Sequence, residues 1–425
     1  MNNKVLLIIA ILFSLKFGQS TPFEAEFFQI QVLYIVAILL FLVLYVTDRC
    51  LRKQKIQANI KYLALLSVSV PVYSALRANT ELSQPLLYGL LAERNWILLG
   101  TGVWIYYLLK TNKVNFLVLE NIFVTLAGMA LIVFTLLWLL VDPSSTQDEL
   151  SFAKVSPDRG LRLKLQYFFI SFGLIYYFIR YTNHGKLADL IKCALFAGFV
   201  MFIIQGRTYI IAVAICLSLY SYMNLSFSRL FSVVCQALFG ILIAISFLDL
   251  FCPQYLTTMH YLFEAMFEAF LGQTSADFSA NARIYEAQKV FELWAIEPVA
   301  MWFGIGKVSN HFNDGFSSIF GYFYPSDIGL LGGVLLYGII GAIFIYALPM
   351  IFAVKLLKDL APCKSDFILS MKYSLLFAMV MPQQEVLFFE PVNFAIPFVV
   401  LLAYRDIFEG GYEASRRAVC LRDSS

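Results

Sequence analysis

The feature that most constrains this chain is a series of apolar runs, each close to twenty residues long, separated by short polar segments. One helix of about 20 residues crosses the hydrocarbon core of a bilayer. Hydrophobic residues make up 60% of the 425 residues and charged residues 14%, which leaves too little polar side chain for the surface of a soluble domain. The sequence therefore predicts an all-α, polytopic integral membrane protein.

We predict about twelve transmembrane helices in a single polytopic domain, residues 1–425. Their approximate ranges are 4–19, 28–47, 62–77, 84–109, 117–141, 166–181, 190–204, 208–224, 230–250, 328–353, 367–383 and 386–404. The first range is short and contains Lys16, so a cleaved signal peptide is an alternative to a retained helix.

Most of the 31 Lys and Arg residues fall in the short loops on one side of these spans. Segment 48–61 and the tail beyond residue 404 are the richest in them. Because Lys and Arg are enriched in cytoplasmic loops, we expect this side, and both termini, to be cytoplasmic. Loops 142–165 and 252–327 then lie on the extracytoplasmic side, and the great length of the second predicts that it carries the chemistry.

The 252–327 loop begins with two helical patterns. The run ARIYEAQKVFELWAIEP places Ile284, Ala287, Phe291 and Trp294 on one face, which predicts an amphipathic helix on the outer membrane surface. The run MHYLFEAMFEAFL, residues 259–271, follows a similar pattern. The loop is thus predicted to carry short amphipathic helices.

Two further segments complete the loop. In FGIGKVSNHFNDGF, Gly304 and Gly306 permit tight turns, and charged or titratable residues follow them. In YPSDIGLLGG, Asp327 is a candidate cap for the next membrane helix, whose glycines allow close packing.

The order of these features resembles the outer loop of bacterial O-antigen polymerases and ligases. It comprises an arginine-led amphipathic helix, a Trp and a Pro, a glycine pair, a His, and SDIGLLG before a membrane helix. QGRTYIIA, within residues 203–212, is similar to the family's entry into a helix through a small residue and an arginine, and QPLLYGLLAERNW, residues 84–96, to another recurring segment. Loop 142–165 departs from the paired arginine-to-glycine motifs often described for the polymerases.

The resemblance implies a GT-C-like membrane glycosyltransferase in a bacterial inner membrane, with its active face extracytoplasmic. Its donor and acceptor would be oligosaccharide repeat units on undecaprenyl pyrophosphate, joined into an O-antigen, capsule or exopolysaccharide. Membrane lipid, a flippase and chain-length regulator proteins are further implied partners. A D-x-D motif does not occur and the loop has no clear metal cluster, so we expect a metal-independent transfer without cofactor.

Three residues carry the expected chemistry. Arginine spreads the charge that develops on a pyrophosphate leaving group, and the resemblance gives this role to Arg207 and Arg283. It makes His311 the residue that orients or deprotonates the acceptor hydroxyl. The alternatives are structural: Arg207 at a tight outer turn or Arg283 on an interfacial helix would contact only lipid phosphates, and His311 would face water.

Four weaker candidates are assigned to substrate binding. Arg94, beside Glu93, fits a substrate contact or an internal ion pair equally well. Lys307, Asp314 and Asp327 are more often surface charges, and become candidates through their place in the loop.

Other function classes remain for comparison. A net charge of +3 without a basic stripe argues against nucleic acid. An O-antigen ligase would transfer the finished glycan to an acceptor lipid and use similar residues. A lipid-linked oligosaccharide flippase would instead distribute ionisable residues along its spans, whereas the span interiors are nearly free of charge apart from Glu93 and Arg94.

Overall fold

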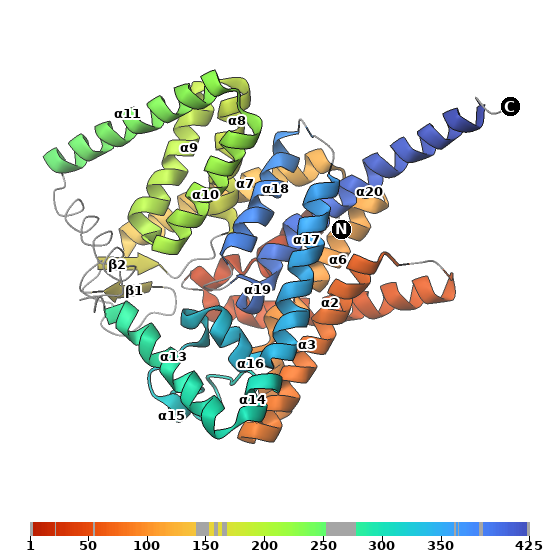
Figure 1. Cartoon of the computed structure of the whole chain (residues 1–425), viewed down its shortest axis with the longest axis vertical. Helices are drawn as coiled ribbons and strands as arrows, with labels where there is room; N and C mark the ends of the chain where they lie inside the picture. Colours follow the sequence, from red (N-terminus) through yellow and green to blue (C-terminus); the bar gives the residue numbers. More distant parts are fainter. Residues whose placement is uncertain are drawn as a thin grey trace. The chain divides into compact units, whose positions relative to one another are not determined.

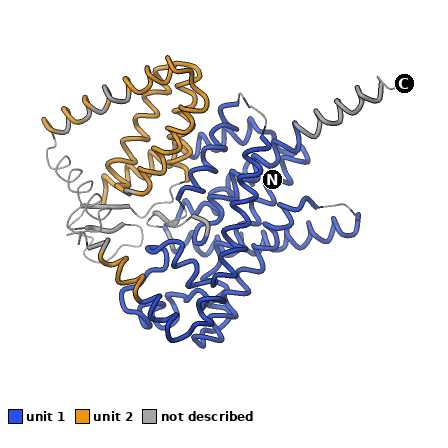
Figure 2. The backbone as a smooth tube through the Cα atoms, viewed as in Figure 1, with its two compact units in different colours: residues 1–126, 289–425 blue, residues 127–288 orange. Residues whose placement is uncertain are grey.

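The computed structural model describes residues 3–141 apart from 22, 54 and 55, residues 153–156, 160–163 and 168–251, and residues 278–422 apart from 361, 362, 364 and 382–385. The chain divides into two compact units, residues 1–126 with 289–425 and residues 127–288 (Figure 2). The predicted segment 259–271 and the rest of 252–277 lie outside the described residues.

Unit 1 is helical in its described parts. Its elements are α1 (Asn3–Ser14), η1 (Phe17–Ser20), α2 (Glu24–Leu51), α3 (Ala58–Leu82), α4 (Leu86–Ala92), α5 (Arg94–Ile97), α6 (Gly100–Lys110), α14 (Pro298–Phe303), α15 (Ser317–Phe320), η4 (Pro325–Ile328), α16 (Leu330–Ala342), η5 (Ile343–Ala347), α17 (Leu348–Asp359), α18 (Asp366–Val380), α19 (Val386–Phe389) and α20 (Pro391–Arg422) (Figure 1). The helices α7 (Phe116–Leu140) and α13 (Phe278–Ile296) each cross the division between the units.

Unit 2 adds α8 (Phe168–His184), α9 (Leu187–Phe199), the π-helical turn η3 (Val200–Ile204), α10 (Arg207–Asn224) and α11 (Phe227–Phe251). It also contains two short antiparallel strands, β1 (Ala153–Ser156) and β2 (Gly160–Leu163), in which Ala153 pairs with Leu163. This hairpin is a small addition to the predicted all-α fold. It lies within loop 142–165.

Six helices in the described part of the chain are long and apolar enough to cross a membrane. They are Ala25–Leu51, Ala58–Leu82, Phe116–Leu140, Leu187–Ile204, Leu330–Asp359 and Pro391–Phe408. A helical, membrane-embedded protein is thereby confirmed, and each of these helices overlaps one predicted span. The count of about twelve stays a prediction.

One predicted span, 84–109, is not a continuous helix. The chain forms α4, α5 and α6 in turn, and the first break falls at Glu93, whose backbone departs from helical geometry (φ −97°, ψ 14°). Glu93 is fully buried, so the break places its carboxylate inside unit 1. This interrupted segment positions the site described below.

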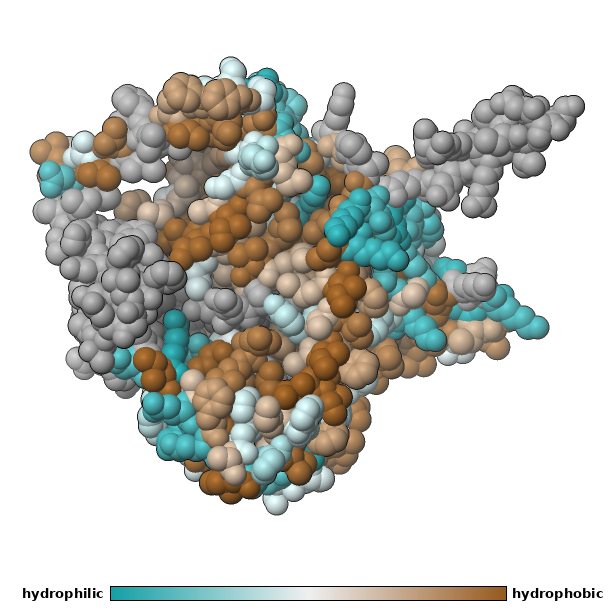
Figure 3. All heavy atoms as spheres, viewed as in Figure 1, coloured by the Kyte–Doolittle hydropathy of each residue, from teal (hydrophilic) through white to brown (hydrophobic). Residues whose placement is uncertain are grey.

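Much of the surface is apolar, as a lipid environment requires. Brown, hydrophobic side chains cover a large part of the face seen in Figure 3. On α2, for example, Leu33, Leu40 and Val43 are each more than half exposed. Such surface is unfavourable in water and ordinary against lipid tails.

The predicted amphipathic helix is present as α13, but its apolar face differs from the prediction. Ile284 and Phe291 are 57% and 58% exposed, whereas Val290 is fully buried in the apolar core of unit 1 and Trp294 packs against that core. The helix uses one side to pack on protein, so only part of the predicted face remains outside. The prediction assumed that lipid alone would cover it.

Candidate functional site

The backbone of residues 304–306 lies against an interruption in α16. Gly338 is non-helical (φ 73°, ψ 171°), and at this break the carbonyl groups of Leu335 and Leu336 accept hydrogen bonds from the N–H groups of Ile305 (3.0 Å) and Gly306 (2.9 Å). A helix break frees carbonyl groups for such outside donors. The loop and the helix therefore complete each other's hydrogen bonding.

The glycine pair makes this close approach possible, as predicted. Gly304 and Gly306 have φ values of 71° and 79°, a region that side chains resist. A Cβ atom on Gly304 would collide with the Leu336 backbone, and one on Gly306 with the Ser74 backbone of α3.

Side chains from α3 and the turn after it fix the next residues. Ser74 Oγ accepts the backbone N–H of Lys307 (2.9 Å). Gln84 donates its amide to the Lys307 carbonyl (3.1 Å) and accepts the Ser309 N–H (2.7 Å). Residues 307–309 thus have defined positions although they belong to no helix.

A buried hydrogen-bond chain ends on Glu93. Its carboxylate accepts from Ser74 Oγ (2.6 Å) and from the Tyr337 hydroxyl (2.9 and 3.0 Å). Each hydroxyl oxygen also accepts a hydrogen bond. Ser74 Oγ accepts from the Lys307 backbone N–H, and the Tyr337 oxygen accepts from the Trp96 indole N–H (3.0 Å). Both hydroxyl protons therefore point to Glu93. The Lys307 ammonium lies 4.0 Å from the carboxylate, which supplies the cation that a buried carboxylate needs.

From this hydrogen-bond network, Lys307 extends into a pocket of about 520 Å³ within unit 1. Its volume falls in the usual range for small-molecule sites. The wall is mixed polar and aromatic, formed by Asn95, Lys307, Val308, Asn310, Asp314, Phe316, Ser317, Phe323, Tyr324, Pro325, Ser326, Leu336, Phe389 and Glu390.

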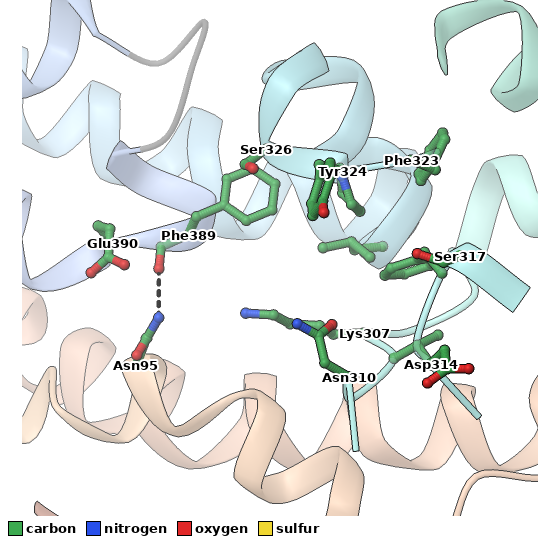
Figure 4. Close-up of a pocket in the computed structure, with 14 residues that line it drawn as sticks. Asn95, Lys307, Asn310, Asp314, Ser317, Phe323, Tyr324, Ser326, Phe389 and Glu390 are labelled. Atoms are coloured by element: carbon green, nitrogen blue, oxygen red, sulfur yellow. Dashed lines mark hydrogen bonds between the residues drawn. The ribbon is translucent and has the colours of Figure 1, made fainter. Parts of the chain in front are cut away.

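The pocket has two ends of different character (Figure 4). The Lys307 ammonium points toward the end where Asn95 and Glu390 lie, and Asp314 lies with Ser317 at the opposite end. The Asn95 amide donates to the Phe389 carbonyl (2.9 Å). This bond uses the side chain to join α5 to the last residue of α19.

Behind the first end, Glu390 forms an ion pair with Lys16 at 2.5 Å. The side chain of Lys16 is 5% exposed and that of Glu390 19%. A desolvated pair of this kind holds its partners tightly, because removing either leaves a buried charge alone.

Two of the seven predicted site residues, Lys307 and Asp314, line this pocket. His311 is exposed and does not line it, although it follows Asn310, which does. Asp327 lies in η4, one residue beyond the lining residue Ser326. Its predicted role as helix cap is wrong, because Gly329 occupies the N-cap position of α16.

Arg94 and Glu93 take different directions despite being neighbours. Glu93 bonds to Ser74 and Tyr337, while the Arg94 guanidinium donates to the Leu91 carbonyl (3.2 Å) and lies over the Phe28 ring, 4.9 Å from its centroid. The buried partners of Glu93 thus come from α3 and α16. The sequence had suggested an internal ion pair with its neighbour Arg94.

Arg207 and Arg283 belong to unit 2. The predicted tight turn at QGR is present: η3 ends at Ile204, Gln205 is left-handed (φ 50°), and Gly206 is the N-cap of α10, which starts at Arg207. Arg283 is exposed on α13.

The sequence interpretation missed Asn95, Asn310, Glu390 and Lys16. A signal existed for the last two, since each is an ionisable residue within or beside an apolar run and their charges are opposite. Asn95 and Asn310 carry no such signal.

Among the described residues, no group of three or more His, Cys, Asp or Glu side chains is placed to hold a metal ion. The site instead offers one ammonium group, two carboxylates, amides, hydroxyls and aromatic rings. In comparisons with family models, curated proteins and solved structures, nothing matches this chain.

Proposed function

We propose that this protein is a membrane glycosyltransferase that polymerises undecaprenyl-pyrophosphate-linked oligosaccharide repeat units into a surface polysaccharide. The observation that carries the proposal is the 520 Å³ pocket, with its polar and aromatic wall, in a chain with helices suited to a membrane. Such a wall suits a sugar ring, because hydroxyl groups need hydrogen-bond partners and the C–H faces of the ring pack against aromatic side chains.

The proposed reaction transfers the growing glycan from one carrier lipid to a newly delivered unit. A hydroxyl oxygen of the acceptor forms a bond to the anomeric carbon of the donor, and the bond from that carbon to the pyrophosphate oxygen breaks. The bonding electrons leave with the lipid pyrophosphate, and the hydroxyl proton passes to a base. Two charges therefore need stabilising, on the leaving group and on the attacking oxygen.

The candidate residues divide between these two tasks. Arg207 and Arg283 would donate hydrogen bonds to the pyrophosphate, a role that guanidinium geometry suits. For the base, His311 is the candidate from the sequence, and Asp314 is a second because its carboxylate lines the pocket. Lys307 would orient acceptor hydroxyls.

The proposal includes a topology. The site would face the extracytoplasmic side of a bacterial inner membrane, with both termini cytoplasmic and about twelve spans. The distribution of Lys and Arg in the short loops supports this orientation.

An electrophoretic profile of surface and lipid-linked glycan from a strain lacking the gene tests the proposal. Acceptor lipid bearing a single repeat unit, without a ladder, is the expected result. Long chains stranded on undecaprenyl pyrophosphate would show a ligase instead. Repeat units trapped at the cytoplasmic face would show a flippase and overturn the enzyme proposal.

Complementation of that strain tests the pyrophosphate role. Arg283→Ala is expected to abolish the ladder while protein level stays unchanged, because Arg283 is exposed. Lys289→Ala is the matched control on the same helix, where Lys289 pairs with Glu292 at 2.7 Å, and it should restore the ladder. A full ladder from Arg283→Ala would remove Arg283 from the site.

A further inference from the structure

The charges around the pocket are already compensated by the protein. Lys307, Asp314 and Glu390 are its charged lining residues. Lys307 lies 4.0 Å from the buried Glu93, and Glu390 is paired with the buried Lys16. Of the charged lining residues in the described part of the chain, Asp314 alone has no ion pair of this kind.

The sum of these charges leaves no excess of positive charge. The two lysines and the three carboxylates give a formal net charge of −1. Arg94, which interacts electrostatically with Lys16, brings the total to zero. A pyrophosphate group is usually held by surplus cations, and the described lining of this pocket has none.

The hydrogen-bonding groups of the wall also favour a ligand with donors. Asp314 and Glu390 are acceptors, and the Asn95 amide already donates to the Phe389 carbonyl. Asn310, Ser317 and Ser326 can both donate and accept. The Lys307 ammonium has three N–H groups, so it can donate to a ligand hydroxyl and still interact with Glu93. A phosphate or carboxylate has acceptors only, whereas a hydroxyl group both donates and accepts.

Aromatic side chains complete the wall. Tyr324 and Phe389 line the pocket, and Figure 4 shows the Tyr324 hydroxyl directed toward the space above Lys307. Rings of this kind cover the C–H face of a sugar, while the polar groups reach its edge.

We infer that this pocket binds a sugar ring without negative charge, from the acceptor repeat unit, and excludes both the pyrophosphate and acidic sugars. The inference rests on the proposed function and adds the specificity of this site. It assigns the lipid pyrophosphate to other residues of the chain, and it makes Asp314 the residue that repels an acidic sugar.

Saturation-transfer NMR on the full-length protein in nanodiscs tests the inference, because it detects weak sugar binding. The probes are a neutral methyl glycoside of N-acetylglucosamine, the methyl glycoside of glucuronic acid, and inorganic pyrophosphate. The neutral glycoside should give a signal that neither anion displaces, and the glucuronide should give none. Displacement by either anion, or the absence of any signal from the neutral glycoside, would overturn the inference.

Two matched variants locate the binding. Ser317→Trp should fill the pocket and remove the signal, whereas Ser318→Trp, one residue away and outside the lining, should keep it. Asp314→Asn should raise the glucuronide signal toward that of the neutral glycoside. Asn is chosen because Asp314 has a φ of 58°, a conformation that Asn tolerates. A signal unchanged in Ser317→Trp would place the sugar elsewhere and overturn the inference.

The strain lacking the gene separates this inference from the proposed function. A lost ladder together with anion binding in the pocket would leave the polymerase standing and overturn the specificity. An unchanged ladder together with the expected probe binding would leave the specificity of the pocket standing and overturn the polymerase.

Discussion

Glu93 offers the sharpest test of how the site is held together. Glu93→Ala removes the carboxylate on which the hydroxyl protons of Ser74 and Tyr337 converge. Both hydroxyls stay buried because their acceptor sides remain bonded to the N–H groups of Lys307 and Trp96. The variant therefore leaves two buried donors without an acceptor.

The magnitude follows from those two bonds. A hydrogen bond to a charged group contributes about 1.5–3 kcal/mol, so Glu93→Ala should lower the free energy of unfolding by about 3–6 kcal/mol. This figure counts the two hydrogen bonds alone and leaves out the Lys307 ammonium, which lies 4.0 Å from the carboxylate.

Glu93→Gln is the matched variant. Ser74 and Tyr337 both bond to the same carboxylate oxygen, Oε1, so a Gln carbonyl can replace that oxygen. The amide group then replaces Oε2 and loses the second Tyr337 contact (3.0 Å) and the attraction to Lys307. Two neutral hydrogen bonds retain about 1–3 of those 3–6 kcal/mol, so the expected loss is about 2–3 kcal/mol.

Equilibrium unfolding in mixed detergent micelles, followed by tryptophan fluorescence, measures these differences. The expected order of stability is wild type, then Glu93→Gln, then Glu93→Ala. Equal stability of the Ala and Gln variants would refute the argument, because it would mean that the two buried hydroxyls do not depend on the carboxylate.

Two further predictions concern the backbone and the second ion pair. Gly304→Ala should destabilise the protein more than Gly185→Ala, because both glycines have positive φ but, of the two, only Gly304 has backbone atoms within reach of a new Cβ. In the same unfolding assay the loss should exceed about 2 kcal/mol for Gly304→Ala and stay near 1 kcal/mol for Gly185→Ala. Equal losses would contradict the geometry. Lys16→Met should lower the free energy of unfolding by about 3–5 kcal/mol, because it leaves Glu390 unpaired. In a double-mutant cycle, adding Glu390→Gln should recover part of that loss. If the losses of the two single variants simply add, the ion pair does not contribute to stability.

The membrane-embedded class and six spans could be predicted because hydropathy over twenty residues is a local property. The turn at Gly304 could be predicted for the same reason, since a glycine's backbone freedom does not depend on distant partners. The turn before α10 was also predicted, but its left-handed residue is Gln205 and not Gly206. The local pattern of the loop also made Lys307 and Asp314 candidates, and both line the pocket. Features that depend on a single segment of sequence could thus be predicted.

The site itself depends on pairings that no local pattern contains. Lys16 and Glu390 are 374 positions apart, and Glu93 and Tyr337 are 244 apart. A hydropathy window across residues 84–109 averages over Glu93 and predicts one helix, because it does not include the distant hydroxyls that make a buried carboxylate and a helix break tolerable. The apolar face of α13 was mispredicted in the same way, since its partner in the core is not a neighbour in sequence.

The break at Gly338 has a consequence for biogenesis. A helix inserted into lipid on its own must satisfy its own backbone, and α16 does not, because the carbonyl groups of Leu335 and Leu336 bond to Ile305 and Gly306. Those donors are made earlier in translation and lie outside the helix. The segment therefore reaches its final form only when the preceding loop returns to it, so completion of this helix and closure of the pocket become a single assembly event.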